Sequence, residues 1–474
     1  MLVRLLHFFR NWSVCFFLFS NIVSAQQLND WSLNLIKKNK LSPDHFAIFV
    51  AKSKDSPFVS WRSKESMLPA SITKLLTASA VLHHLPPGSK FKTQLVTEAK
   101  IEKGVLKGDL YLLGGGDPSF VSENMWVLVN NFKRNGISEI AGSLIVDDSL
   151  FDSVRYDPSR ESVRVDRAYD APVGAMSFNW NSMNVFVRPT ARGSLATVTL
   201  DPESDYFILT NQVKTVKGKK LQIDVDREWD DTKNKEIFKV RGEIGDEVTE
   251  HLVFANIQKP DYWSGNNLKS FLQQRGIQVK GQIRIGKAQK SARVLAEVES
   301  KPIELILADM NKFSNNYVSE MLTKNISLKS TQPGSLPVGI QLIKEHLKRV
   351  VGKENGIQLV NPSGLTRENR MSAQALWSVL HHHIMDFTSM PEFFSSLPIA
   401  GVDGTLKRRF KNSDLERHLR AKTGLLNGVA SLAGYLQDEK GELTSFAIMY
   451  NGPGDLARVR ETMDEILEKA YSVK

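Results

Sequence analysis

Ser71 and Lys74 lie three residues apart, just after Pro69 and at the start of an apolar-periodic segment. On a helix, residues i and i+3 share one face, so the ammonium group of Lys74 can reach the hydroxyl group of Ser71. A serine hydroxyl is a weak nucleophile until a base takes its proton, and a lysine in a desolvated pocket can act as that base. The pair therefore predicts nucleophilic catalysis if partner groups lie further along the chain.

A second motif, Ser314-Asn315-Asn316, follows a segment with helical periodicity. Acyl transfer requires a proton for the departing amine, and the hydroxyl of Ser314 is suited to relay one. The side-chain amide of Asn316 can hold a substrate carbonyl group and fix Lys74. These residues are candidates for the proton path and for substrate binding.

A third motif, Lys422-Thr423-Gly424, precedes two strand patterns near the C-terminus. Lys422 supplies positive charge beside the nucleophile, which suits a substrate with a free carboxylate next to the scissile bond. Thr423 can add a hydroxyl donor, and Gly424 permits close approach of an edge strand to the ligand.

In this order, Ser-x-x-Lys, Ser-x-Asn and Lys-Thr-Gly form the motif set of the penicillin-binding proteins and serine β-lactamases. Ser314 follows Ser71 by 243 residues, a far longer interval than β-lactamases or the common small carboxypeptidases have. The chain resembles the class C low-molecular-mass penicillin-binding proteins, the D-alanyl-D-alanine carboxypeptidase/endopeptidases. Further similar stretches are Gly116-Asp117-Pro118, Asp147-Asp148-Ser149-Leu150-Phe151, residues 361–367 and residues 401–406.

The resemblance implies a multidomain α/β (α+β) protein with the penicillin-binding/β-lactamase-like serine transpeptidase fold, in which helices cover an antiparallel sheet. It also implies two β-rich inserted domains, one nested in the other. We expect a signal peptide at 1–25, a catalytic domain at 26–90 and 297–474, inserted domain II at 91–186 and 252–296, and nested domain III at 187–251.

Hydrophobic periodicity predicts the main elements. Helices are expected at 28–45, from Ser71 onward, at 261–275, at 302–313 and from about 455. Strands are expected at 46–51, 94–97, 110–113, 142–146, 183–187, 197–200, 429–436 and 443–450.

The resemblance further implies hydrolysis of D-alanyl peptides in peptidoglycan. Carboxypeptidase action removes a terminal D-Ala, and endopeptidase action cuts a D-Ala-to-diaminopimelate crosslink. Both acylate Ser71, and β-lactam antibiotics are expected to trap the same serine as covalent inhibitors. By resemblance, the backbone amides of Ser71 and Leu425 stabilise the oxyanion. No cofactor is implied.

One position departs from the family pattern. Family members place an aspartate five residues before an aromatic residue, here Tyr169, to hold the side-chain amine of diaminopimelate. This chain has Arg164 at that position, and Asp166 is the nearest carboxylate. The other contacts to that side chain would match Arg367 and Asn427. We expect the Asp166→Ala change to weaken turnover of diaminopimelate-containing peptides more than that of simple acyl-D-Ala-D-Ala.

The N-terminus is typical of a secretory signal peptide, with Arg4 and Arg10 before an apolar run and Val23-Ser24-Ala25 at the cleavage positions. The alternative is an uncleaved anchor, although no apolar run reaches about 18 residues. Cys15, the only cysteine, lies inside this segment, so the mature chain is expected to be free of disulfides. These features predict a periplasmic protein without a transmembrane anchor after cleavage.

The formal net charge of +10 suits peripheral association with anionic polymers of the envelope, although a merely solvated basic surface explains it too. Nucleic acid is not an expected partner, because zinc-finger spacing and dense basic stripes are absent from the sequence. His381, His382 and His383 point around a helix, so they do not predict a metal site; we expect them on a helix surface.

Two alternative functions remain from the sequence. A β-lactamase would use the same acyl-enzyme chemistry but would release penicillin rapidly. A non-catalytic wall-binding protein would keep the fold, but the three intact motifs argue against it.

Overall fold

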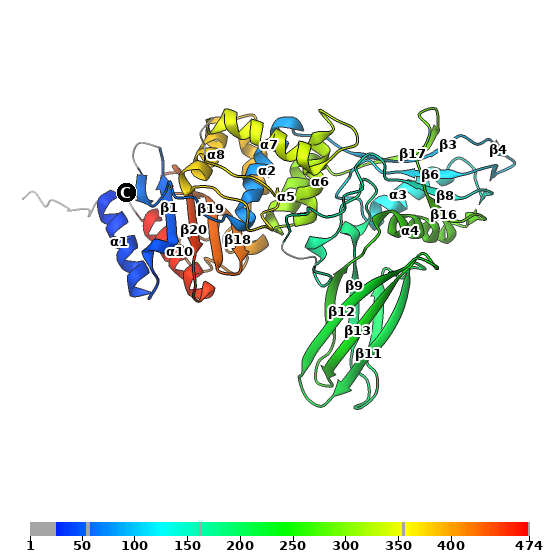
Figure 1. Cartoon of the computed structure of the whole chain (residues 1–474), viewed down its shortest axis with the longest axis horizontal. Helices are drawn as coiled ribbons and strands as arrows, with labels where there is room; N and C mark the ends of the chain where they lie inside the picture. The colour runs from blue at the N-terminus through cyan, green and yellow to red at the C-terminus, as the bar shows by residue number, and fades with distance from the viewer. Residues whose placement is uncertain (1–24, 54–56, 161–163, 353–355, 473–474) are drawn as a thin grey trace, which may run out of the picture.

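The structure is a computed structural model that describes residues 25–53, 57–160, 164–352 and 356–472. Except for Ala25, the predicted signal peptide lies outside the described residues. The fold is a mixed α+β architecture, as predicted, with helices and several sheets. Figure 1 shows two large parts side by side and an arm that projects from their junction.

The first part, which we call the helix–sheet unit, is formed by residues before 92 and after 299. Its five-stranded sheet has the order β18-β19-β20-β1-β2, and every pairing in it is antiparallel. The strands are β1 (Phe46–Ala51), β2 (Pro57–Trp61), β18 (Leu419–Leu426), β19 (Val429–Gln437) and β20 (Leu443–Asn451). β18 is an edge strand, so one side of it is open to a ligand.

Both faces of this sheet are covered, which is why all six residues of β1 are buried. Phe49 packs into the core on the side of α2, and Ile48 packs into the core on the opposite side. Successive side chains of a strand point to opposite faces, so an unbroken apolar run fits this central position.

Helices supply both covering layers. The layer formed by α1 (Ala25–Lys38) and α10 (Leu456–Tyr471) lies on one face. The other face is covered by α2 (Lys74–His84), α5 (Ile303–Lys312), α6 (Asn316–Ser327), α7 (Leu336–Val350), α8 (Ala373–Met385) and α9 (Met390–Ser396). Short 3-10 turns are η1 (Pro43–His45), η2 (Ala70–Thr73), η3 (Ala168–Asp170), η4 (Asn179–Asn181) and η5 (Gly404–Leu406).

The second part is the inserted region, residues 92–299, which separates the first two motifs. One sheet has the order β16-β8-β6-β3-β17 and a smaller one has the order β15-β7-β5-β4. Helices α3 (Ser122–Lys133) and α4 (Pro260–Gln274) pack against them. The strands are β3 (Lys92–Thr97), β4 (Ile101–Glu102), β5 (Val105–Leu106), β6 (Leu110–Leu113), β7 (Glu139–Ile140), β8 (Leu144–Asp147), β15 (Gln278–Val279), β16 (Ile283–Ile285) and β17 (Arg293–Glu299).

The arm in Figure 1 consists of three long strands, β11 (Phe207–Val216), β12 (Leu221–Asp230) and β13 (Lys235–Gly245), in the order β11-β13-β12. At its base a second sheet joins β10 (Thr197–Asp201), β9 (Ser182–Arg188) and β14 (His251–Asn256). β9 and β14 therefore cross the predicted boundaries of the nested domain.

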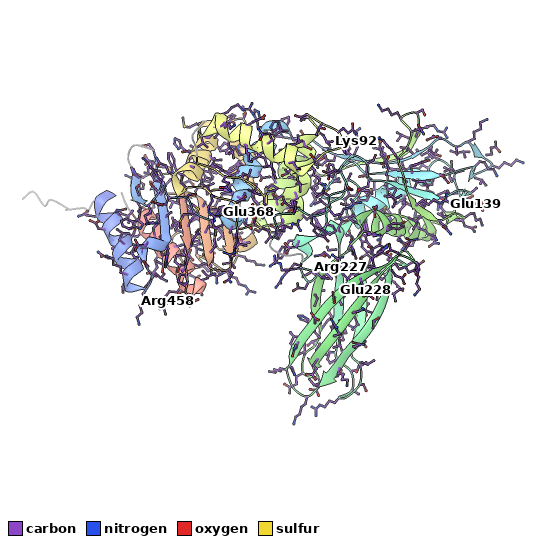
Figure 2. The ribbon with its side chains drawn as sticks, viewed as in Figure 1. Lys92, Glu139, Arg227, Glu228, Glu368 and Arg458 are labelled. Atoms are coloured by element: carbon purple, nitrogen blue, oxygen red, sulfur yellow. The ribbon has the colours of Figure 1, made fainter. Side chains whose placement is uncertain are left out.

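The base of the arm is fixed by a buried polar cluster around Arg227, which Figure 2 labels near the end of β12. Its guanidinium group lies 3.3 Å from a carboxylate oxygen of Glu236 and donates to Tyr156 Oη at 3.0 Å and to Asn256 Oδ1 at 2.8 Å. These partners come from different elements, so the cluster joins the arm to the inserted region.

Helix α6 connects the two parts. All of its residues are buried, although many are polar. Glu320 pairs with Arg160 of the inserted region at 2.7 Å, and Lys324 donates to Asp152 Oδ1 at 2.5 Å. Asn325 donates to the carbonyl oxygen of Gly116 at 2.8 Å. The helix that begins with Asn316 is thus held from its far end by the insertion.

Most predicted elements are confirmed, but two expectations are wrong. The predicted helix at 28–45 ends at Lys38, because Lys40 adopts a left-handed φ of 56° and the backbone amide of Leu41 turns back to the carbonyl oxygen of Ile36 at 3.0 Å. Pro43 then begins a separate 3-10 turn. His383 was expected on a helix surface, yet it is buried, with 2% of its surface exposed. It hydrogen-bonds to Ser79 and Ser389 at 2.9 and 2.8 Å. His381 and His382 are partly exposed.

Candidate active site

The first motif lies where a 3-10 turn passes into a helix. Ser71 is in η2, and Lys74 is the first residue of α2. Ala70, just before the serine, has a φ of 52°, a left-handed conformation that non-glycine residues seldom adopt. The turn brings Lys74 Nζ to 3.2 Å from Ser71 Oγ, the predicted contact between base and nucleophile.

Lys74 is fully buried. Its amine donates to Asn316 Oδ1 and to the carbonyl oxygen of Ser363, both at 2.6 Å. Burial is the main cause that lowers the pKa of Lys74 to about 7, and the negative charges of Asp170 and Glu320 oppose this shift. A lysine with such a pKa is substantially neutral at neutral pH, as a general base must be.

Asn316 is oriented by a buried carboxylate. Its side-chain amide donates to Asp170 Oδ1 at 2.7 Å, which leaves its carbonyl oxygen for Lys74. The second carboxylate oxygen, Asp170 Oδ2, accepts from Arg164 Nε at 2.7 Å. A continuous polar chain therefore runs from Arg164 to Lys74.

The loop at residues 361–364 forms the wall behind Lys74. Asn361 Oδ1 accepts from the backbone amides of Ser363 and Gly364 at 2.8 and 3.0 Å, which fixes the carbonyl group that Lys74 contacts. Gly364 has a φ of +83°, and a Cβ atom there would lie 2.0 Å from the carbonyl oxygen of Ala70. Only glycine fits between this loop and the turn that carries the nucleophile.

The second and third motifs meet beside the first. Lys422 is buried and donates from Nζ to Ser314 Oγ at 2.8 Å. Burial, and secondarily the charge of Lys74, lowers the pKa of Lys422. Thr423 Oγ1 donates to Thr405 Oγ1 at 2.8 Å, so two hydroxyl groups lie next to each other beside the edge strand.

Gly424 allows β18 to approach the nucleophile turn. A Cβ atom at this position would lie 2.2 Å from Ser431 Oγ, 2.8 Å from the carbonyl oxygen of Pro69 and 3.0 Å from the backbone nitrogen of Ser71. The backbone around Gly424 is therefore next to the amide of Ser71. This proximity suits an oxyanion site that uses the amides of Ser71 and Leu425.

These groups line one cleft of about 740 Å³. Its polar floor includes Ser71, Ser314 and Asn316, whereas an apolar rim is formed by Tyr169, Phe313, Leu365, Leu425, Leu426 and Leu456. Three arginines also line it: Arg164, Arg409 and Arg460.

The chain matches the D-Ala-D-Ala carboxypeptidase 3 (S13) family over residues 32–470. It belongs to this family. The three motifs and their contacts are thus those of a hydrolase of the carboxypeptidase type.

Relatives and solved structures agree with this S13 membership. The chain is 30% identical to a D-alanyl-D-alanine carboxypeptidase of Actinomadura sp. strain R39 over 406 residues, which cover 82% of this chain and 74% of the relative. It is 26% identical to D-alanyl-D-alanine carboxypeptidase DacB of Haemophilus influenzae, with 86% of each chain covered.

The crystal structure of penicillin-binding protein 4 (dacB) from Haemophilus influenzae superposes with a TM-score of 0.79 at 24% identity and covers 93% of this chain and 99% of that chain. The predatory peptidoglycan endopeptidase Bd3459 of Bdellovibrio bacteriovorus shares the fold at a TM-score of 0.52 and 15% identity, and covers 90% of this chain and 92% of that chain. The predicted family and fold are confirmed.

The S13 cleft does not bring Asp166 together with the other predicted residues. Asp166 is exposed and lies 3.6 Å from Arg167 in an ion pair, whereas Arg164 lines the cleft and stacks over Tyr169 at 5.7 Å. Arg367 donates to the carbonyl oxygen of Asn427 at 2.7 Å, so these two predicted residues do meet. The role of Asp166 in substrate recognition stays a prediction.

Sequence reasoning missed several residues of this S13 site. Asp170, Arg409, Ser431 and Arg460 carry no motif of their own, and Ser363 and Thr405 belong only to the similar stretches at 361–367 and 401–406. For Asp170 a signal existed, because it directly precedes the Ala171-Pro172 step. Its contact with Asn316, 146 positions away, required the structure.

Proposed function

We propose that this S13 carboxypeptidase is a serine DD-peptidase that acts on peptidoglycan stem peptides through an acyl-enzyme on Ser71. It removes a terminal D-Ala as a carboxypeptidase and cuts D-Ala-to-diaminopimelate crosslinks as an endopeptidase. It works in the periplasm after its signal peptide is removed, with peripheral attraction to the anionic envelope.

The observation that carries this proposal is the position of Lys74 Nζ. A neutral amine has two N–H bonds, and these are directed to Asn316 Oδ1 and to the carbonyl oxygen of Ser363. Its lone pair then faces Ser71 Oγ at 3.2 Å. A lysine held in this way accepts the proton of the serine hydroxyl as the nucleophile attacks.

In the acylation step, a bond forms between Ser71 Oγ and the carbonyl carbon of D-Ala, and the proton of Ser71 passes to Lys74. The oxyanion is stabilised by the amides of Ser71 and Leu425. The C–N bond then breaks, and the proton that Lys74 took from Ser71 is relayed through the hydroxyl of Ser314 to the leaving amine, which returns Lys74 to its neutral form. Lys422, which is bonded to Ser314 at 2.8 Å, orients this hydroxyl.

In the deacylation step, water attacks the ester carbonyl carbon. The bond to Ser71 Oγ breaks, the serine regains a proton, and the peptide leaves with a new carboxyl group. A β-lactam acylates Ser71 in the same way, but its leaving amine stays tethered, which slows the attack of water. One related crystal structure, of penicillin-binding protein 4 (dacB) from Haemophilus influenzae, is a complex with a β-lactam.

The test combines a labelled penicillin with purified muropeptides. We expect the mature protein to form a long-lived adduct at Ser71, identified by mass spectrometry of the tryptic peptide, and to convert pentapeptide stems to tetrapeptides. The Ser71→Ala variant should do neither while keeping its thermal unfolding midpoint.

Each rival function has its own outcome in this experiment. Rapid release of hydrolysed penicillin without peptide cleavage would identify a β-lactamase. The absence of both adduct and cleavage, with a folded protein, would identify a non-catalytic wall-binding protein.

A further inference from the structure

The cleft extends past the catalytic groups along the outer edge of β18. Arg409 and Arg460 line it there, together with Thr423 and Thr405. Among the described residues that line this cleft, every charged side chain is an arginine and there is no carboxylate. The cleft therefore favours an anionic ligand.

Arg409 is close to Thr405 in the chain, and both residues line the cleft. It follows Thr405 by four residues in the same loop, and Thr405 bonds to Thr423, where the substrate carboxylate is expected. Arg409 is anchored by Asp464 of α10, to which it donates from Nε at 3.1 Å and from a terminal nitrogen. Its charge is partly neutralised by that pair.

Arg460 has no such partner. It is exposed, and its Nε donates only to the carbonyl oxygen of Leu456, one turn earlier in α10, at 3.2 Å. Among the described residues no carboxylate lies within ion-pair distance of Arg460. The charge of Arg460 does act on Asp464, since it lowers the pKa of that carboxyl against the dominant raising effect of burial.

Arg409 is therefore paired with Asp464, which does not itself line the cleft, whereas Arg460 acts on Asp464 only through its charge. Glu461 also lies near Asp464, but it does not line the cleft. A positive charge that lines a cleft and lacks a partner is suited to bind a substrate carboxylate through charge-assisted hydrogen bonds.

The two reactions proposed above differ in how far their leaving groups extend. A carboxypeptidase leaving group is one D-Ala, whose single carboxylate is accommodated near Lys422 and Thr423. An endopeptidase leaving group is an amine on a second stem peptide, which carries further carboxylates. Only the second leaving group carries carboxylates beyond the one expected near Lys422 and Thr423, and these need further cationic partners in the cleft.

We propose that Arg460, supported by Arg409, binds a carboxylate of the acceptor stem peptide and so favours cleavage of crosslinks. This inference rests on the proposed function, because it assigns a specificity residue within the same cleft.

The experiment compares Arg460→Gln with Arg458→Gln. Figure 2 shows Arg458 on the outer edge of the helix–sheet unit, where it points away from the molecule; it does not line the cleft. For both variants, kcat and KM are measured with a crosslinked muropeptide dimer and with a monomeric pentapeptide muropeptide, and the rate of penicillin acylation is recorded.

We expect Arg460→Gln to lower kcat/KM for the dimer roughly tenfold, mainly through KM, as loss of a charge-assisted hydrogen bond does. Its kcat/KM for the pentapeptide and its penicillin acylation rate should stay within about twofold of wild type. Arg460→Lys should recover part of the loss, and Arg458→Gln should leave both substrates unchanged. Raising the ionic strength should increase KM for the dimer in wild type but not in Arg460→Gln.

Equal losses of kcat/KM on the two substrates, or no loss on the dimer, would contradict the proposal that Arg460 binds the acceptor stem peptide. So would a wild-type protein that cleaves the pentapeptide but not the dimer. Failure of the proposed function is a different result, in which wild type forms no penicillin adduct and cleaves neither substrate. Arg409 is not the residue to change first, because its loss would leave the largely buried Asp464 unpaired.

Discussion

The floor and the rim of the cleft hold their polar groups in different ways. Beneath the floor, Lys74 and Lys422 are fully buried, and each is bonded to an oxygen of another motif. On the rim, Arg460 is exposed and bonded only to its own helix. The buried amines have lowered pKa values and fixed geometry, which suits chemistry common to every substrate. The exposed groups of the rim are suited to distinguish one substrate from another.

The largest effect is expected on the floor. Lys74→Met keeps an unbranched side chain that is one atom shorter but removes the base, so penicillin acylation and pentapeptide hydrolysis should fall by about 10²- to 10⁴-fold. In wild type the acylation rate should rise with pH through about 7 and level off above it, because only the neutral form of Lys74, whose pKa is about 7, accepts a proton. Stopped-flow acylation from pH 5 to 9 measures this profile.

A pH profile that stays flat across pH 7, or a Lys74→Met variant with normal acylation, would contradict the role of Lys74 as the base. It would also contradict the proposed difference between floor and rim. Circular dichroism provides the control for folding.

A smaller effect is expected from Asp170, which contacts Asn316, a partner of Lys74. In Asp170→Asn the group that orients Asn316 loses its charge, and acylation should fall by roughly tenfold for all substrates, since misplacement of a positioning residue affects every reaction alike. Removal of this negative charge should also lower the pKa of Lys74, because Asp170 is the main group that raises it. The ascending limb of the pH profile should therefore move to lower pH.

If Asp170→Asn slows acylation but leaves the pH profile in place, Asp170 has a structural role only. A loss confined to one substrate would assign Asp170 to the rim instead.

Outside the residues that line the cleft, Asp166→Ala should reduce kcat/KM a few-fold for diaminopimelate-containing peptides and leave simple acyl-D-Ala-D-Ala unchanged. The change removes one carboxylate from an exposed ion pair with Arg167, so the effect is limited by solvent screening. Competition assays with a mixture of the two peptides give the ratio directly. Equal losses of kcat/KM on the two peptides would contradict the assignment of Asp166.

The smallest effect on activity at neutral pH is expected from a buried histidine pair behind α2. His346 and His383 both contact Ser79 Oγ, and burial, with smaller effects of neighbouring histidines, lowers the pKa of each to about 3. A pKa lowered from about 6.5 means that the unfolded chain binds the proton more readily. Stability is therefore full above pH 6.5 and falls as the pH decreases toward 3.

At pH 5 each histidine should cost about 2 kcal/mol of unfolding free energy relative to pH 7.5. Thermal melts of wild type and His383→Asn at the two pH values test this. The difference between the two melting temperatures should be smaller in the variant, and an equal difference would contradict the assignment.

The sequence predicts the floor far better than the rim. Ser71, Lys74, Ser314 and Lys422 belong to short motifs, because each motif needs a fixed local spacing. The rim depends on residues such as Arg409 and Arg460, whose types are common on any surface and whose position follows from the packing of α10 against a distant loop. Their role becomes visible only once that packing is known.

The same contrast holds for the fold. Buried strands such as β1 stand out as apolar runs, whereas the predicted end of α1 lies seven residues too far, because the left-handed turn at Lys40 that ends the helix has no glycine to mark it in the sequence. The burial of His383 depends on α2 and α9, which lie elsewhere in the sequence. Tertiary contacts decide such cases.

Helix α6 has a consequence for any attempt to simplify this protein. Deletion of residues 92–299 would remove Arg160 from Glu320 and Asp152 from Lys324, and would uncover part of a helix whose residues are all buried in the full chain. The inserted region thus stabilises the helix that carries Asn316. A shortened enzyme without residues 92–299 would need a redesigned α6.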